Sequence, residues 1–203
     1  MRYPPEHKEA TRRRIIQRAA RLFRQRGYAG VSIDTLMNDA GLTRGGFYSY
    51  FKNKADLFAC AVEFEPEFTQ RLQEREATDK RGLRDEGIAI AQNYVSKAYR
   101  KQVLKGCAMA SLAMETSRAP AQAQRRYAAV IRDLVAEFSR GLKDSDRSAA
   151  SGEAETLDDR ALQAITTAIG GLLLANATAA DTELADRISE AAQAQIAEVL
   201  ARP

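Results

Sequence analysis

Hydrophobic positions recur along most of the chain at spacings of three or four residues, which is the period of an α-helix. In residues 11–26 the arginines cover most of the surface, and one face is apolar: Ile15, Ile16, Ala19, Leu22 and Phe23. No segment shows the alternation of apolar and β-branched residues that is typical of a strand. The pattern predicts an all-α fold in which Gly27 ends the first helix.

The segment 32–51 is predicted to hold two short helices joined by a tight turn. Ser32 stands where the N-cap of the first of them belongs, Gly41 ends that helix, and Thr43 can cap the next. Phe47 and Phe51 lie four residues apart, so they share the inner face of the second helix. Four residues are then left to face outward: Arg44, Gly45, Tyr48 and Ser49.

The rest of the chain reads as further helices, which makes about nine in all. A helix begins near Asn53 and is kinked or ended by Pro66, and another begins at Pro120 and carries an apolar stripe as far as Leu142. Residues 143–156 are small, polar and charged, as in a flexible surface loop. Residues 161–180 contain no charged residue and scatter their polar ones, which predicts a helix that is buried all round.

Two environments can bury such a helix. A membrane span needs roughly 20 apolar residues, but this segment is rich in Ala and Thr and carries Gln163 and Asn176, which hydrocarbon tolerates poorly. The preferred alternative is a homodimer in which Gly170 and Gly171 let helices approach closely. The last helix would complete that interface with one apolar face: Ala185, Ile188, Ala192, Ile196 and Val199.

The charge is distributed unevenly. Residues 1–54 hold twelve Lys or Arg and four Asp or Glu, a net charge of +8, and since the whole chain carries +4, the remainder carries −4. A basic head implies a polyanionic partner, either nucleic acid or anionic lipid. The expected domains are therefore residues 1–54 and 55–203. Two cysteines and no apolar leader before the basic stretch predict a cytoplasmic protein without a disulfide framework.

The paired short helices have the form of a unit that places its second helix in the major groove of double-stranded DNA. Arg44 stands at the start of that helix, and arginine suits a bidentate contact with guanine. Gly45 and Gly46 each cost roughly 1 kcal/mol relative to Ala in a helix interior, which indicates that something must approach the backbone closely. The hydroxyl groups that follow can contact phosphates: Tyr48, Ser49 and Tyr50.

The residues Gly-Val-Ser-Ile-x-x-Leu at 30–36, Ala-Gly-Leu-Thr at 40–43 and Phe-Tyr-x-Tyr-Phe-x-x-Lys-x-x-Leu at 47–57 resemble the tetracycline-repressor (TetR) family. The resemblance covers about residues 10–60. It implies a homodimeric regulator that represses by occupying a palindromic operator and leaves it when a small-molecule effector binds the C-terminal domain. It also implies DNA contacts by Ser32, Thr43, Arg44, Gly45, Gly46, Tyr48, Ser49, Tyr50 and Lys54.

The effector site is less sharply defined. Cys107 and its neighbours resemble a sub-group of the same family in which a cysteine senses electrophiles or oxidants; the alternative is a small packed residue, as is expected of Cys60. Adaptable apolar side chains suggest a pocket, although the same residues would also make a plain core. The expected set is Phe58, Val62, Tyr94, Cys107, Met109, Met114 and Tyr127.

Two other functions were weighed against a regulator. An enzyme is disfavoured because His7 is the single histidine and lies in the N-terminal arm, and because no metal-ligand cluster, cofactor motif or Gly-rich phosphate loop appears. A non-specific architectural DNA-binding protein would explain the basic head, but it would leave the large apolar C-terminal part without a purpose.

Overall fold

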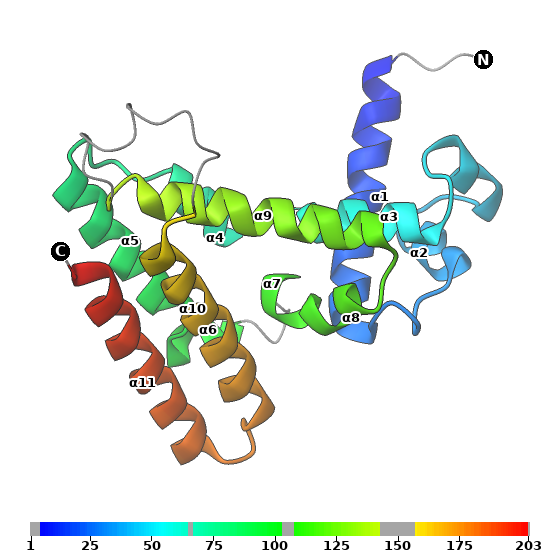
Figure 1. Cartoon of the computed structure of the whole chain (residues 1–203). Coiled ribbons are helices and arrows are strands. Elements are labelled where there is room, and N and C mark those ends of the chain that lie inside the picture. Colours follow the sequence, from blue (N-terminus) through cyan, green and yellow to red (C-terminus); the bar gives the residue numbers. More distant parts are fainter. Residues whose placement is uncertain (1–4, 65–66, 103–107, 143–156, 203) are drawn as a thin grey trace. The chain divides into compact units, whose positions relative to one another are not determined.

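The computed structural model describes residues 5–64, 67–102, 108–142 and 157–202. These residues form eleven α-helices, one 3₁₀-helix and no strand, which confirms the all-α fold; the excess over nine comes from short helices in residues 97–117 (Figure 1). The helices are α1 (Pro5–Arg26), α2 (Ile33–Asp39), η1 (Arg44–Ser49), α3 (Lys54–Glu63), α4 (Glu67–Gln73), α5 (Lys80–Tyr94), α6 (Lys97–Gln102), α7 (Ala108–Ser111), α8 (Ala113–Ser117), α9 (Ala121–Ser139), α10 (Asp159–Ala177) and α11 (Thr182–Ala201).

The chain divides into two compact units. The first unit is made of residues 1–66 and 105–129, and the second unit of residues 67–104 and 130–203. Helix α3 therefore packs with the N-terminal helices, although the sequence pattern assigned it to a domain that begins at residue 55. The expected division into a DNA-binding and an effector-binding domain concerns function, and it stays a prediction.

The first unit is built around the apolar face of α1. The five residues that the pattern placed on this face are all buried, and the ring of Phe23 meets that of Phe58 edge to face at 5.1 Å. Gly27 ends α1 and Gly41 follows α2, both with positive φ (69° and 72°), a conformation that favours glycine. The helix boundaries in this part of the chain thus follow the sequence signals closely.

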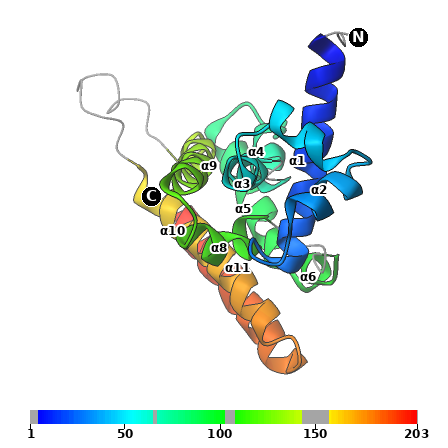
Figure 2. The same ribbon diagram turned by 90° about the vertical axis from the view of Figure 1, so that its right-hand side faces the viewer.

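In the second unit, α10 and α11 form an antiparallel pair (Figures 1 and 2). A Cβ atom on Gly171 would lie 2.7 Å from Cβ of Ala192, so this glycine allows the two helices of one chain to approach closely, whereas Gly170 faces open space. The apolar face of α11, which was expected to complete a dimer interface, packs within the same chain: Ala185, Ala192, Ile196 and Val199 are buried, and Ile188 is half-buried.

In a single chain the helix expected at residues 161–180 is covered on one side only, and the expected cover of its other side by a second copy stays a prediction. One face of α10 is buried, and it is composed of Ala161, Ala164, Ile165, Ala168, Leu172 and Ala175. The opposite side exposes Leu173 and Leu174 by 40% and 57%. No helix in the described part of the chain is long and apolar enough to cross a membrane. The proposed surface loop at 143–156 lies outside the described residues.

A buried arginine ties three segments of the second unit together. The side chain of Arg75 is 1% exposed, and its guanidinium donates hydrogen bonds to the carbonyl oxygens of Leu72, Leu83 and Glu137 at 2.7, 2.7 and 2.6 Å. The carboxylate of Glu137 lies 3.4 Å away and balances its charge. Burial lowers the pKa of Arg75, but its hydrogen bonds all require the charged fork.

We expect Arg75→Ala to lower the free energy of unfolding by about 3–5 kcal/mol, because it removes three hydrogen bonds to part-buried carbonyl groups and the charge that balances Glu137. Arg75→Lys should recover little of this loss, since an ammonium group cannot reproduce the planar fork. Urea denaturation measures both. The control is Arg81→Ala, whose side chain is 85% exposed and whose loss should change stability by less than about 0.5 kcal/mol. Equal stability of Arg75→Ala and the control would contradict this role.

Candidate nucleic-acid interface

The second helix of the helix-turn-helix is η1, a six-residue 3₁₀-helix. Thr43 occupies its N-cap with extended backbone (φ −83°, ψ 151°), as predicted, but its side chain makes no capping hydrogen bond. The amide of Gly46 donates to the carbonyl of Thr43 at 3.1 Å, which closes a three-residue turn. The 3₁₀ form differs from the ordinary helix expected; two consecutive glycines and a length of six residues both weaken an α-helix.

The inner and outer faces of η1 agree with the sequence pattern. Phe47 and Phe51 are buried at 0% and 2% exposure, and they anchor η1 to the core of the first unit. Tyr48 is 62% exposed and packs only the edge of its ring against Phe47. Five further residues of the expected DNA-contacting set are exposed: Ser32, Thr43, Arg44, Gly45 and Ser49. The remaining three are half-buried: Gly46, Tyr50 and Lys54. The outer face therefore presents one guanidinium, two hydroxyls and bare backbone.

The chain itself gives no steric reason for glycine at position 45. A Cβ atom placed there would meet nothing within 4 Å, and its backbone lies outside the positive-φ region that favours glycine. Gly46 is closer to the protein, since its Cβ atom would lie 3.7 Å from Cε of Met37. Gly45 thus leaves an open approach to the backbone of η1.

Helix α2 supports η1 through polar contacts. Ser32 is the N-cap of α2, as predicted, and its hydroxyl accepts a hydrogen bond from the Thr35 amide at 3.1 Å. The guanidinium of Arg44 donates to the carboxylate of Asp34 at 3.1 Å, so the first residue of η1 is paired with the first turn of α2. The sequence analysis did not predict this pair.

Lys54 has a structural partner. Its Nζ donates to the carbonyl oxygens of Tyr28 and Val31 at 2.7 and 2.8 Å, and it lies 4.2 Å from the centre of the Tyr28 ring. Desolvation lowers the pKa of Lys54 in this half-buried position. The side chain therefore holds the connection between α1 and α2, a role that the motif alone did not reveal.

Glu115 of α8 holds the same connection from the other side. Its carboxylate accepts a hydrogen bond from the amide of Tyr28 at 2.9 Å, which satisfies a backbone donor just beyond the end of α1. The two residues are 87 positions apart, so no local signal in the sequence could have predicted the contact. Glu115, the residue after the expected effector residue Met114, thus contacts the connection that leads into the helix-turn-helix.

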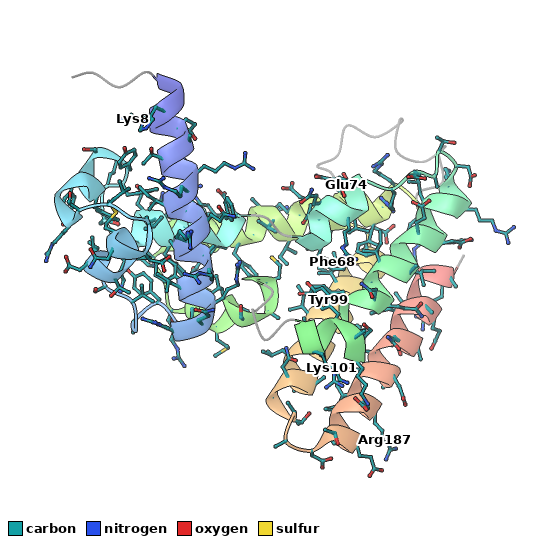
Figure 3. All side chains as sticks on the ribbon, turned by 180° about the vertical axis from the view of Figure 1, so that it is seen from behind. Lys8, Phe68, Glu74, Tyr99, Lys101 and Arg187 are labelled. Atoms are coloured by element: carbon teal, nitrogen blue, oxygen red, sulfur yellow. The ribbon has the colours of Figure 1, made fainter. Side chains whose placement is uncertain are left out.

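Exposed cations extend the basic surface along α1. Arg13, Arg14 and Arg18 are exposed, and Lys8 lies near the start of the helix (Figure 3). Arg12 is engaged instead within the first unit, since its Nη2 donates to Sγ of Cys60 at 3.3 Å. Burial raises the pKa of the Cys60 thiol, in keeping with the packed residue that was expected at this position.

The residues expected to line an effector pocket fall into different surroundings. Phe58 and Val62 belong to the core of the first unit and Tyr127 packs against it, donating from its hydroxyl to the carbonyl oxygen of Met109 at 2.7 Å. Met114 is 57% exposed. Cys107 lies outside the described residues. No group of three or more metal-ligating side chains occurs among the residues described.

Tyr94 lies in the second unit, where its ring stacks on Phe68 with centroids 4.4 Å apart. The rings of Phe68 in α4 and Tyr94 in α5 border a small opening, and Tyr99 in α6 also lines it (Figure 3). Its full lining is Phe68, Arg71, Ile90, Asn93, Tyr94 and Tyr99. The opening has room for about one water molecule. Of the residues expected to line an effector pocket, Tyr94 borders this opening, and the expected pocket as a whole stays a prediction.

Known proteins match most strongly over the helix-turn-helix. Residues 15–61 match the model of the bacterial regulatory proteins of the tetR family. The transcriptional regulator AcrR of Shigella flexneri is 43% identical over 51 residues, which are 25% of this chain and 24% of that protein. The repressor NemR of Escherichia coli K12 is 26% identical over 106 residues, 52% and 53% of the two chains. The matched regions thus span about half or less of these relatives.

Solved structures share the whole fold. The reduced form of E. coli NemR superposes with a TM-score of 0.72 at 22% identity, over 96% of this chain and 100% of that one. A TetR-family regulator from Cytophaga hutchinsonii gives 0.69 at 18% identity, over 99% and 100%. The complex of SmeT with triclosan gives 0.62 at 21% identity, over 93% and 90%. The N-terminal part of the chain is thus similar to the bacterial regulatory proteins of the tetR family, and the whole chain shares the fold of solved TetR-family regulators.

Proposed function

We propose that this protein is a transcription regulator that reads a palindromic operator by placing η1 in the major groove of DNA. The outer face of η1 carries this proposal: Arg44, Tyr48 and Ser49 project from a helix whose inner face is fixed by Phe47 and Phe51. Arg44 is the base-reading residue, and the hydroxyls of Tyr48 and Ser49 contact phosphates or base edges. Gly45 lets the DNA approach the backbone.

The remaining predicted contacts position the protein on the phosphate backbone. Ser32, Thr43 and Tyr50 flank η1, and Gly46 lies within it. The exposed arginines of α1 add positive charge that releases counterions from DNA. We assign Lys54 a positioning role, because its ammonium group is already hydrogen-bonded to two carbonyl groups. It fixes the turn before α2 and thereby the orientation of η1.

We propose that two copies associate through α10 and α11. Residues 161–180 carry no charge, and the leucines exposed on these two helices are Leu173, Leu174 and Leu184. A surface of exposed leucines among uncharged residues is more stable in contact with another protein surface than in contact with water. A two-fold dimer presents two η1 helices, and the operator then has matching two-fold symmetry.

We further propose that the regulator represses and that a small molecule releases it. The name of NemR as a repressor supports the first part, and the SmeT–triclosan complex, a protein of the same fold with a small molecule, supports the second. The opening beside Tyr94 is too small for such a molecule, so binding there requires the surrounding aromatic side chains to move. The chemical class of the effector, including the electrophiles suggested by Cys107, follows from resemblance alone.

Selection of genomic DNA fragments by the purified protein tests the central proposal. We expect one palindromic sequence to be enriched, with an affinity that falls steeply as salt rises. Arg44→Ala should bind that sequence about 10- to 100-fold more weakly, because a bidentate contact with guanine is lost. Arg81→Ala, which removes an equal charge from an exposed site on α5, should bind as the wild type does. Enrichment without sequence preference would favour an architectural DNA-binding protein instead.

Gly45→Ala separates folding from recognition. The added methyl group meets no atom of the protein, so we expect an unchanged or slightly higher melting temperature, together with weaker operator binding because the methyl group stands between η1 and the groove. The comparison is Gly41→Ala, also in open space but at φ 72°, which should lose about 1–2 kcal/mol of stability. Wild-type operator affinity in Gly45→Ala would argue against close approach of DNA at this position.

Leu174→Glu tests the dimer surface. Placing a charge at this 57% exposed position should raise the dimer dissociation constant at least about tenfold, since an unpaired charge would be buried on association. Sedimentation equilibrium measures the change. Leu157→Glu, a leucine of 40% exposure that precedes α10, is the matched control and should leave association unchanged. If Leu174→Glu still dimerises at the protein concentrations at which the wild type does, the interface lies elsewhere.

A further inference from the structure

Two acidic residues interrupt the basic N-terminal region. Between residues 10 and 54, the acidic residues are Asp34 and Asp39, both on α2. Each pairs with an arginine from another helix: Asp39 with Arg21 of α1 at 2.6 Å, and Asp34 with Arg44 of η1 at 3.1 Å. The two pairs differ in environment, because the side chain of Asp39 is 23% exposed and that of Asp34 is 51% exposed.

Stability does not explain the second pair. An ion pair between exposed side chains contributes little to folding, and Arg44 is itself 64% exposed. A carboxylate on a surface that faces phosphates also opposes DNA binding. A place in the first turn of α2 favours an acid at position 34 in the free protein, but it does not explain the pairing with Arg44. That contact strengthens in the bound state, where water is excluded.

The geometry of the pair allows Arg44 and Asp34 to contact neighbouring bases at the same time. The bond to Asp34 uses a donor on Nη1, and the guanidinium carries five N–H donors in a rigid plane, so Nε and Nη2 can still form the parallel pair that matches O6 and N7 of guanine. A carboxylate can only accept hydrogen bonds. In the major groove it is compatible with the N4 amino group of cytosine or the N6 amino group of adenine, and it repels the acceptors O4, O6 and N7.

We propose that Asp34 is a specificity-determining residue: it fixes the plane of Arg44 for guanine and accepts a hydrogen bond from the amino group of a neighbouring cytosine. The inference rests on the proposed operator binding by η1. Asp34 thereby makes Arg44 selective, because a guanidinium held at Nη1 cannot swing to the nearest phosphate. The alternative is that Asp34 acts only as a mask, which means that it competes with DNA for Arg44 and adds no sequence preference. Removing Asp34 would then tighten binding to every sequence equally.

The experiment compares wild type, Arg44→Ala, Asp34→Ala and the double variant on the selected palindrome. The test position is the base pair whose preference Arg44→Ala loses. The readout is the dissociation constant for DNA with a substituted pair at this position divided by that for DNA with the preferred pair. We expect a wild-type ratio of about 5 to 150. Asp34→Ala should lower it about fivefold or more and should bind unrelated DNA more tightly. In the Arg44→Ala background, loss of Asp34 should leave the ratio unchanged.

Asp39→Asn is the matched control, since it removes one negative charge from the same helix without touching Arg44; circular dichroism verifies that each variant is folded. Asp34→Asn keeps a hydrogen-bond acceptor without the charge, and it should retain part of the discrimination. If Asp34→Ala tightens binding to every sequence by the same factor, Asp34 is a mask and the inference is overturned. If the wild type enriches no palindrome at all, the proposed function itself has failed, and the inference fails with it.

Discussion

The connection between α1 and α2, residues 27–31, is the constraint on which the first unit depends. Its amide at Tyr28 is taken by the carboxylate of Glu115, and its carbonyls at Tyr28 and Val31 are taken by the ammonium group of Lys54. Hydrogen bonds to charged groups are roughly twice as strong as neutral ones. The turn that sets the angle of α2, and with it the place of η1, is therefore fixed by side chains from α3 and α8 rather than by its own sequence.

This arrangement explains which parts of the fold could be predicted. Signals that act within one turn of helix were read correctly: Ser32 and Asn53 cap their helices, and Gly27 and Gly41 end theirs with positive φ. The inward position of Phe47 follows from the same short-range periodicity. These features depend on residues three or four positions apart, which a sequence displays directly.

Features that depend on distant residues were not predicted. Nothing near Tyr28 indicates Glu115, and nothing near Lys54 indicates that its charge is used inside the protein. The surroundings of the expected effector residues were not predicted for the same reason, since an apolar stripe does not tell which neighbour covers it: Phe58 lies in the core, whereas Met114 is exposed. The pairing of Asp34 with Arg44 is intermediate in sequence separation, because the two residues are ten positions apart on either side of one turn.

Because η1 is short, it can make few contacts with bases, and this number bears on whether two copies of the chain must act together. Three outward side chains, Arg44, Tyr48 and Ser49, can make about three contacts with base edges, each worth about 1–3 kcal/mol of discrimination. A genome offers about 10⁶ or more competing sites, and a preference of that size corresponds to about 8 kcal/mol. One copy of η1 reaches this figure only when every contact is near its upper limit, whereas two copies on one palindrome pass it with ordinary contacts. Under the proposed function, a recognition helix this short needs a second copy of the chain, and we assign the contact between the two copies to the uncharged, leucine-bearing side of α10.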